Sequence, residues 1–117
     1  MSAVIIPARY GSTRFPGKVL ADIDGKPMIV RVAEQAVQTS ADKVIVVTDN
    51  EKVYEVCSKI ERVSVMMSPS DLSTGTDRVA YAAKNIDDDI IINVQGDEPF
   101  IPPVLIEQLI QGLKNDK

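Results

Sequence analysis

The sequence predicts an α/β fold: a doubly wound, mostly parallel sheet with helices on both faces. Two observations carry this prediction. Short runs rich in valine and isoleucine alternate along the chain with longer amphipathic segments, and this alternation is typical of buried parallel strands joined by helices. The chain also has 117 residues, of which 44% are apolar. It is therefore large enough to form one domain, or part of one, with a real core.

Four strands are expected, each an apolar run bounded by polar or turn-forming residues. The third run is weaker than the others. In chain order the strands are AVIIP (residues 3–7), KVIVVTD (43–49), RVSVMM (62–67) and DIIINVQ (89–95).

A helix is expected after each strand, because apolar residues recur there at helical spacing. The first helix opens near Pro27, since proline is favoured in the first helical turn. The four apolar faces consist, in chain order, of Met28, Ile29, Val32, Ala33, Ala36 and Val37; of Val53, Val56, Cys57 and Ile60; of Val79, Ala82, Ala83 and Ile86; and of Leu105, Ile106, Leu109, Ile110 and Leu113.

Right-handed crossovers between parallel strands give the four strands the spatial order 3-2-1-4. In such sheets ligands bind beyond the carboxyl ends of the strands, where the strand order reverses. The first and fourth strands are the neighbours at that reversal. We therefore expect the loop after the first strand to lie beside Asp97, which follows the fourth strand.

Composition excludes several kinds of chemistry. The chain has no histidine and one cysteine, so zinc sites with the usual ligands and Ser–His or Cys–His nucleophiles cannot be built within it. The net charge of −4 argues against nucleic acid and anionic membranes as partners. No apolar run approaches the roughly 20 residues that cross a bilayer, and no signal peptide is expected. The single Cys57, expected to be buried and inert, agrees with a cytoplasmic location.

The loop PARYGSTRFPGK (residues 7–18) concentrates positive charge in an acidic chain. It contains Arg9, Arg14 and Lys18 and no acid, and the first carboxylate of the chain is Asp22. Backbone N–H groups of a glycine-containing turn, together with arginine and lysine, can hold phosphate oxygens. The spacing matches neither the P-loop nor the dinucleotide-binding turn. A solvated surface loop is the alternative, but the position directly after the first strand favours phosphate binding.

Three further motifs carry candidate ligand-binding groups. NVQGDEP (93–99) presents Asp97 and Glu98 after a strand, and Mg²⁺ is commonly held by one or two carboxylates together with substrate phosphates. An ordinary acidic turn explains this motif equally well by itself. STGTDR (73–78) offers hydroxyl groups and Arg78 at a helix start, where either anion binding or simple capping is expected. Thr48 and Asp49 likewise either contact a ligand or cap the next helix.

These motifs, in this order and spacing, resemble the 3-deoxy-manno-octulosonate (Kdo) cytidylyltransferases, also called CMP-Kdo synthetases. The residues that carry the resemblance are PARYGSTRFPGK, GKPMI, VVTD, STGTDR and NVQGDEP. The opening motif is shared with sialic acid cytidylyltransferases, whereas NVQGDEP is more specific to the Kdo enzymes. The resemblance covers nearly the whole chain and implies a fold like that of nucleotide-diphospho-sugar transferases.

The resemblance also implies an activity and a set of roles. Such enzymes transfer CMP from CTP to Kdo for lipopolysaccharide synthesis, releasing pyrophosphate and using Mg²⁺. By motif matching, Arg9, Lys18 and Asp97 would be the catalytic residues, with Asp97 as the metal ligand. The nucleotide would be bound by Ala8, Arg9, Tyr10, Ser12, Lys18, Arg78 and Gln95.

Members of this family are roughly twice as long as this chain, as expected for a sheet with further strands. Residues 1–117 are therefore expected to be the nucleotide-binding part of one cytidylyltransferase domain, with the fold truncated after the fourth strand and its helix. The sugar site, a second metal-binding acid and the contacts of a homodimer would lie in the other part. The fourth strand would keep an open edge, which invites association, and turnover by this chain would be poor. A cytidylyltransferase for 8-amino-Kdo or sialic acid and an inactive CTP-binding module stay open as alternatives.

Overall fold

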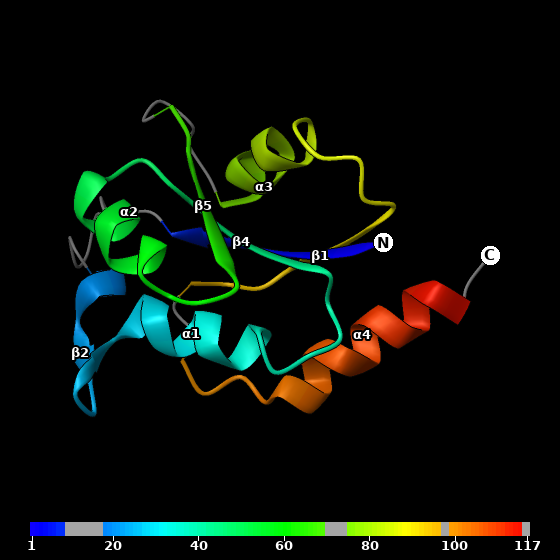
Figure 1. Cartoon of the computed structure of the whole chain (residues 1–117), viewed down its shortest axis with the longest axis horizontal. Helices are drawn as coiled ribbons and strands as arrows, with labels where there is room; N and C mark the ends of the chain where they lie inside the picture. Colours follow the sequence, from blue (N-terminus) through cyan, green and yellow to red (C-terminus); the bar gives the residue numbers. More distant parts are fainter. Residues whose placement is uncertain (9–17, 70–74, 97–98, 116–117) are drawn as a thin grey trace.

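The computed structural model describes residues 1–8, 18–69, 75–96 and 99–115. Its main sheet has four parallel strands in the order β5-β4-β1-β6 (Figure 1). In chain order the strands are β1 (Ser2–Ala8), β4 (Lys43–Thr48), β5 (Val63–Met67) and β6 (Ile90–Asn93). This order confirms the predicted arrangement 3-2-1-4.

The central strand is β1, which pairs with β4 on one side and with β6 on the other. All seven of its residues are buried, as expected for an apolar run covered on both faces. The register joins Ala8 to Thr48 and Ser2 to Ile90. The carboxyl ends of β1 and β4 therefore lie at the same edge of the sheet.

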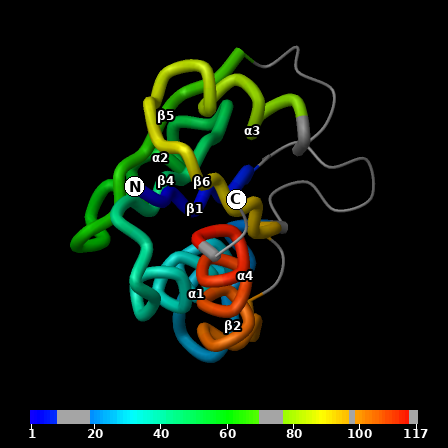
Figure 2. The backbone as a smooth tube through the Cα atoms, turned by 90° about the vertical axis from the view of Figure 1, so that its right-hand side faces the viewer, coloured from blue at the N-terminus to red at the C-terminus, as the bar shows by residue number. Residues whose placement is uncertain are grey.

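Helices cover both faces of the sheet, as the sequence predicts (Figures 1 and 2). The larger core lies under α1 (Met28–Ala36), α2 (Glu51–Ser58) and α4 (Pro103–Asn115), whereas α3 (Gly75–Ala83) packs on the opposite face against β1 and β4. On the three-helix face, α2 lies over β4 and β5, α1 lies beside it, and α4 lies over β6. Within the described ranges no helix is both long and apolar enough to cross a membrane.

The first helix starts directly after Pro27, as predicted, but it is shorter than the apolar pattern indicates. The hydroxyl of Thr39 donates to the carbonyl oxygen of Ala36 at 2.7 Å and accepts from the N–H of Ala41 at 3.3 Å. A threonine that bonds the backbone in this way competes with helix continuation. The chain therefore leaves the helix before β4 begins.

A small hairpin before α1 was not predicted. The 3₁₀ turn η1 (Lys18–Leu20) leads into β2 (Asp22–Ile23), which pairs antiparallel with β3 (Lys26–Pro27). The connecting residues Asp24 and Gly25 have φ of 51° and 92°, and an Asp-Gly pair with two positive φ angles is favoured in tight hairpins. The dipeptide was visible in the sequence, but strands of two residues show no periodicity.

Helix α4 is tied to the end of α1 by polar contacts. The N–H and the hydroxyl of Ser40 donate to the two carboxylate oxygens of Glu107 at 2.7 and 2.6 Å, and the amide of Gln35 donates to the carbonyl of Ile101 at 3.0 Å. The hydrogen bond from the Ser40 hydroxyl is the largest cause that lowers the pKa of Glu107, to about 2. These contacts fix the side of α4 that faces α1.

The acidic run at residues 87–89 forms ion pairs with groups at the starts of two strands. The Asp88 side chain is 1% exposed and accepts from the ammonium of Lys43 at 2.6 Å. The neighbouring Asp89 accepts from the N-terminal amine at 2.6 Å. The run therefore fastens the start of β6 to the starts of β1 and β4.

Cys57 is fully buried in the larger core, as predicted. Burial disfavours the thiolate and raises the pKa of the thiol from 9.0 to about 12. The folded chain at pH 8 should therefore leave Cys57 unlabelled by Ellman's reagent for hours, because the thiolate is the reactive form. The chain unfolded in guanidinium should react within minutes.

The same pKa shift predicts a pH effect on stability. Because the folded state favours the neutral thiol, its contribution is fully present below pH 9 and is lost progressively between pH 9 and 12. Urea unfolding across this range, compared with a Cys57→Ala variant that lacks the titrating group, measures the loss. Rapid labelling of the folded chain at pH 8 would contradict the buried placement.

Candidate functional site

The carboxyl ends of β1, β4 and β6 form the candidate site. Ala8 pairs with Thr48 in the sheet register, and the N–H of Val94 donates to the carbonyl of Ile5 at 3.0 Å. The backbone of Gly96 then passes directly beside Pro7 and Ala8. The residues that lead into the cationic loop and those that lead into Asp97 thus lie side by side, as the predicted strand order requires.

Gly96 fits at this edge because it lacks a side chain. A Cβ atom at this position would lie 2.7 Å from the carbonyl oxygen of Pro7 and 3.4 Å from the Ile29 side chain. The Pro7 carbonyl oxygen belongs to the backbone of β1, so it cannot move aside by a change of side-chain rotamer. Close approach of two backbones is a common reason for glycine beside a sheet, and here it brings residues 95–96 against the end of β1.

A buried ion pair lies at the same edge. Arg78, in the first half of α3, is fully buried, and its Nη2 lies 2.9 Å from Oδ2 of Asp49, which directly follows β4. Asp49 is 14% exposed. A charge-assisted hydrogen bond of this length is strong in a low-dielectric environment. The pair therefore fixes the start of α3 to the carboxyl end of β4.

The neighbouring polar residues have separate structural tasks. The Asn50 side chain caps α2 by accepting from the N–H groups of Lys52 and Val53 at 2.8 and 3.2 Å. The Thr48 hydroxyl accepts from the N–H of Asn50 at 3.2 Å and supports this cap. Capping therefore accounts for Asn50 and Thr48, whereas Asp49 is directed to Arg78.

Two buried oxygens at this edge, Oδ1 of Asp49 and Oγ of Ser68, have no hydrogen-bond partner among the residues that the structure describes. Ser68 is held here because its N–H donates to the carbonyl of Thr48 at 2.8 Å. Buried polar atoms are normally hydrogen-bonded. A further oxygen of this kind, Oδ2 of Asp88, lies at the opposite edge of the sheet, so unpartnered oxygens do not by themselves locate the site.

The structure places four of the proposed nucleotide-binding residues. Ala8 ends β1 and is buried, Gln95 follows β6 and is exposed, and Arg78 is buried in its ion pair. Lys18 begins η1. Arg9, Tyr10, Ser12 and Asp97 lie outside the described residues. Among the residues that are described, no group of three His, Cys, Asp or Glu side chains could hold a metal ion.

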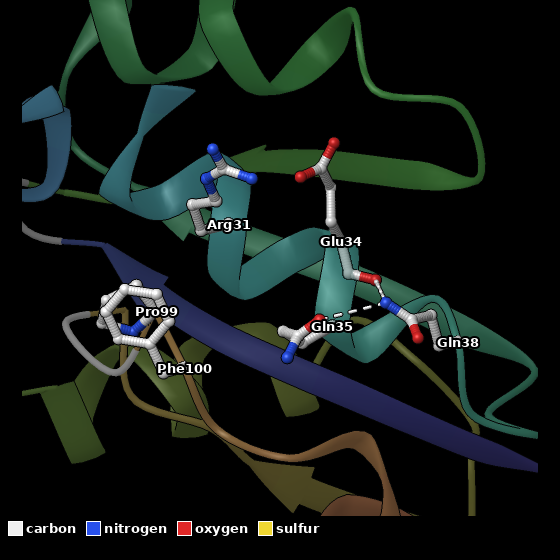
Figure 3. Close-up of a pocket in the computed structure, with 6 residues that line it drawn as sticks. All are labelled: Arg31, Glu34, Gln35, Gln38, Pro99 and Phe100. Carbon is white, nitrogen blue, oxygen red and sulfur yellow. Dashed lines mark hydrogen bonds between the residues drawn. The ribbon is translucent and has the colours of Figure 1, made fainter. Parts of the chain in front are cut away.

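A separate cavity of about 390 Å³ lies between α1 and the segment at Pro99 and Phe100 (Figure 3). Its polar groups already have structural partners. The Arg31 guanidinium donates to the carbonyls of Ile23 and Asp24 at 3.0 and 2.6 Å, and Glu34 accepts from Lys26 at 2.7 Å. These hydrogen bonds hold the β2–β3 hairpin against α1, and none of the residues that line the cavity belongs to the Asp49–Arg78 pair.

Comparison with known structures first defines the class of fold. A nucleotidyl transferase from Methanothermobacter superposes with a TM-score of 0.82 over 92% of this chain and 56% of its own, at 22% sequence identity. A CMP:2-keto-3-deoxy-manno-octonic acid synthetase, solved in complex with CTP, superposes with a TM-score of 0.93 over 98% of this chain and 48% of its own, at 43% identity. The fold is therefore that of the nucleotidyltransferases.

Sequence comparison then defines the family. Residues 3–117 match the cytidylyltransferase family, and the chain belongs to it. The 3-deoxy-manno-octulosonate cytidylyltransferase of Trichlorobacter lovleyi is 54% identical over 92% of this chain and 42% of its own length. That of Proteus mirabilis is 51% identical over 98% of this chain and 46% of its own. The chain thus spans about half the length of the curated relatives it matches.

Replacing Gly96 with alanine should destabilise the fold by about 1–3 kcal/mol, because the new methyl group forces the segment away from the β1 backbone. Gly112→Ala in α4 is the matched control. A Cβ atom there meets no atom within 4 Å, so the higher helix propensity of alanine should stabilise the chain by about 0.5–1 kcal/mol. Urea unfolding of both variants measures the difference. Equal effects at the two positions would contradict the close approach at Gly96.

Replacing Asp49 with alanine should cost about 3–5 kcal/mol of unfolding free energy, because it removes a carboxylate from a fully buried guanidinium. Glu55→Ala is the control: Glu55 faces Lys59 at 4.0 Å on the surface of α2, with both side chains 74% exposed. Such an exposed pair should contribute less than about 0.5 kcal/mol. Chemical denaturation measures both changes, and a small loss for Asp49→Ala would show that the pair is not a structural anchor.

Proposed function

We propose that this chain provides the CTP-binding part of an enzyme that transfers CMP from CTP to Kdo, with release of pyrophosphate. The observation that carries the proposal is the superposition, over 98% of this chain, on a CMP-Kdo synthetase solved with CTP. The curated relatives reported above are named for the same sugar acid. This supports Kdo over sialic acid as the acceptor, and it supports a role in lipopolysaccharide synthesis.

In this proposal the phosphates of CTP bind at the carboxyl edge of β1. Arg9, Ser12 and Lys18 hold the triphosphate, and Ala8 and Tyr10 lie against the nucleotide. The position of Ala8 beside Gly96 supports this assignment, because the cationic loop and Asp97 begin at residues that the sheet holds together. An arginine- and lysine-containing loop with glycine is suited to phosphate oxygens.

Gln95 and Arg78 complete the nucleotide pocket in two different ways. Gln95 is exposed just after β6 and can offer its amide to the nucleotide. Arg78 is fully buried and bound to Asp49, so it shapes the pocket by holding the first half of α3 against the sheet. The first turn of α3 includes Gly75, within the STGTDR motif.

The reaction needs positioning and charge neutralisation more than acid–base groups. The anomeric oxygen of the sugar forms a bond to the α-phosphorus of CTP while the bond to the β-phosphate oxygen breaks, and pyrophosphate leaves with the electron pair. The sugar hydroxyl loses its proton to a base that we leave unassigned. Arg9 and Lys18 would neutralise the charge that develops on the phosphate oxygens. Asp97 would supply a carboxylate that holds Mg²⁺, and the ion when bound would add charge neutralisation at the triphosphate.

The share of its relatives that the chain covers supports a second candidate function at the same site, which is CTP binding without appreciable catalysis. Because it spans about half of its relatives, the chain acting alone would bind CTP with little or no turnover. The sugar site and a homodimer contact would belong to the other half of the fold.

The buried, neutral thiol of Cys57 is compatible with the reducing cytoplasm, where we place the enzyme.

Calorimetric titration with CTP and MgCl₂ should show selective binding, with ATP and UTP binding at least tenfold more weakly. Arg9→Ala should weaken CTP binding at least tenfold, because it removes a charge-assisted contact to phosphate. Lys59→Ala, which removes a mostly exposed cation from α2, should leave binding unchanged. If the chain is folded by circular dichroism and does not bind CTP, or if Arg9→Ala binds it as well as the parent chain, the proposal fails.

A further inference from the structure

The Asp24–Gly25 dipeptide forms the tip of the β2–β3 hairpin. Both residues are exposed, with φ of 51° and 92°, and the tip projects from the start of α1 (Figure 1). No other aspartate or asparagine in the sequence precedes a glycine. Because glycine has no Cβ atom, its nitrogen is the least hindered that an aspartate side chain can meet in the next residue.

An aspartate side chain and the nitrogen of the next residue can react with each other. The nitrogen of Gly25 attacks Cγ of the protonated Asp24 carboxyl group. A C–N bond forms, and the hydroxyl oxygen of the carboxyl group leaves as water with the amide proton, which gives a five-membered succinimide. Water then opens the ring. Attack at Cγ restores aspartate, whereas attack at the main-chain carbonyl carbon gives isoaspartate, whose backbone runs through Cβ and Cγ.

The folded hairpin holds the two reacting groups apart. Successive positive φ angles at Asp24 and Gly25 define the mirror image of a type I turn, in which ψ of the first central residue is about 30°. Ring closure requires Cβ of Asp24 and the nitrogen of Gly25 to be eclipsed about the Cα–C bond. For an L residue this needs a ψ of about −120°, the value in the mirror image of a type II turn. The peptide plane between the two residues must therefore rotate before the ring can close.

The Arg31 side chain opposes this rotation. Its Nη2 donates to the carbonyl oxygen of Asp24 at 2.6 Å, and its Nε donates to the carbonyl oxygen of Ile23 at 3.0 Å. The Asp24 carbonyl belongs to the peptide plane that must rotate, so rotation breaks a short charge-assisted hydrogen bond. Arg31 itself lies on α1 (Figure 3). The guanidinium therefore ties the tip of the hairpin to a regular helix.

We propose that Asp24 is a site of isoaspartate formation and that Arg31 controls the rate by holding the Asp24 carbonyl. In the intact hairpin the dipeptide reacts slowly. When the guanidinium moves away, the peptide plane turns and the succinimide can close. An isoaspartate adds one carbon atom to the backbone between β2 and β3, so the pairing of Ile23 with Lys26 is disturbed.

The modification would reach the candidate site through η1. Lys18 begins η1, which leads into β2 and packs against α1. The N–H of Met28 donates to the carbonyl of Ala21 at 2.8 Å and closes the base of the hairpin. A lengthened hairpin should loosen this base and hold Lys18 less firmly. This consequence rests on the proposed function, whereas the formation of isoaspartate does not.

Incubation in water enriched in oxygen-18 measures the reaction, because each opening of the succinimide places one labelled oxygen in the residue. The folded chain, an Arg31→Gln variant and a synthetic peptide of residues 21–28 are incubated at neutral pH. Mass spectrometry with electron-transfer fragmentation then separates isoaspartate from aspartate. Residue 24 should gain label at least tenfold faster in the peptide than in the folded chain, and at least fivefold faster in Arg31→Gln.

Lys26→Gln is the matched control. Lys26 is a cation of the same hairpin, but its ammonium donates to Glu34 at 2.7 Å. Its loss should leave the labelling rate within twofold of that of the parent chain, and circular dichroism checks that both variants fold. Absence of label at residue 24 in the peptide would reject the site. Equal rates in the peptide and the folded chain, or in the two variants, would reject control by Arg31.

Discussion

Pairing of β1 with two neighbours is the constraint on which the rest of the structure depends. The strand is buried along its whole length, and its hydrogen bonds hold β4 on one side and β6 on the other. This pairing brings together residues that are far apart in the chain: Ala8, Thr48 and Gly96. The candidate site is therefore a product of strand order, since no local segment contains more than one of its parts.

The opposite face of the sheet is organised by a single polar anchor. Helix α3 is the only described helix on that face, and its small apolar core includes Ala82 and Ile5. The Asp49–Arg78 pair adds a directional contact that a small core does not supply. A buried pair of this kind is weak evidence for overall stability, because desolvation offsets much of the Coulomb attraction. Its effect here is to fix where α3 begins relative to the ends of β4 and β5.

The sequence was sufficient to predict the four main strands, their order and the helix after each, because long apolar runs have clear periodicity. Features that depend on tertiary contact were not predictable. Asp49 and Arg78 are 29 residues apart, and no local pattern reveals that an arginine will be buried. The same limit applies to α4, where the apolar pattern does not distinguish the buried Ile106 from the exposed Leu109. Whether a side chain is buried depends on which other elements pack against it, and the local sequence of a segment does not contain that information.

The register between Ser2 and Ile90 also has a consequence for synthesis of the chain on the ribosome. The strand β1 is made before α1, α2 and α3, whereas its neighbour β6 is made after all three of these helices. At about 5–20 residues per second, the strand β1, which is buried along its whole length in the folded chain, waits several seconds with an unpaired edge. A sheet whose centre is its first strand therefore folds late and slowly, as expected for non-local parallel pairing.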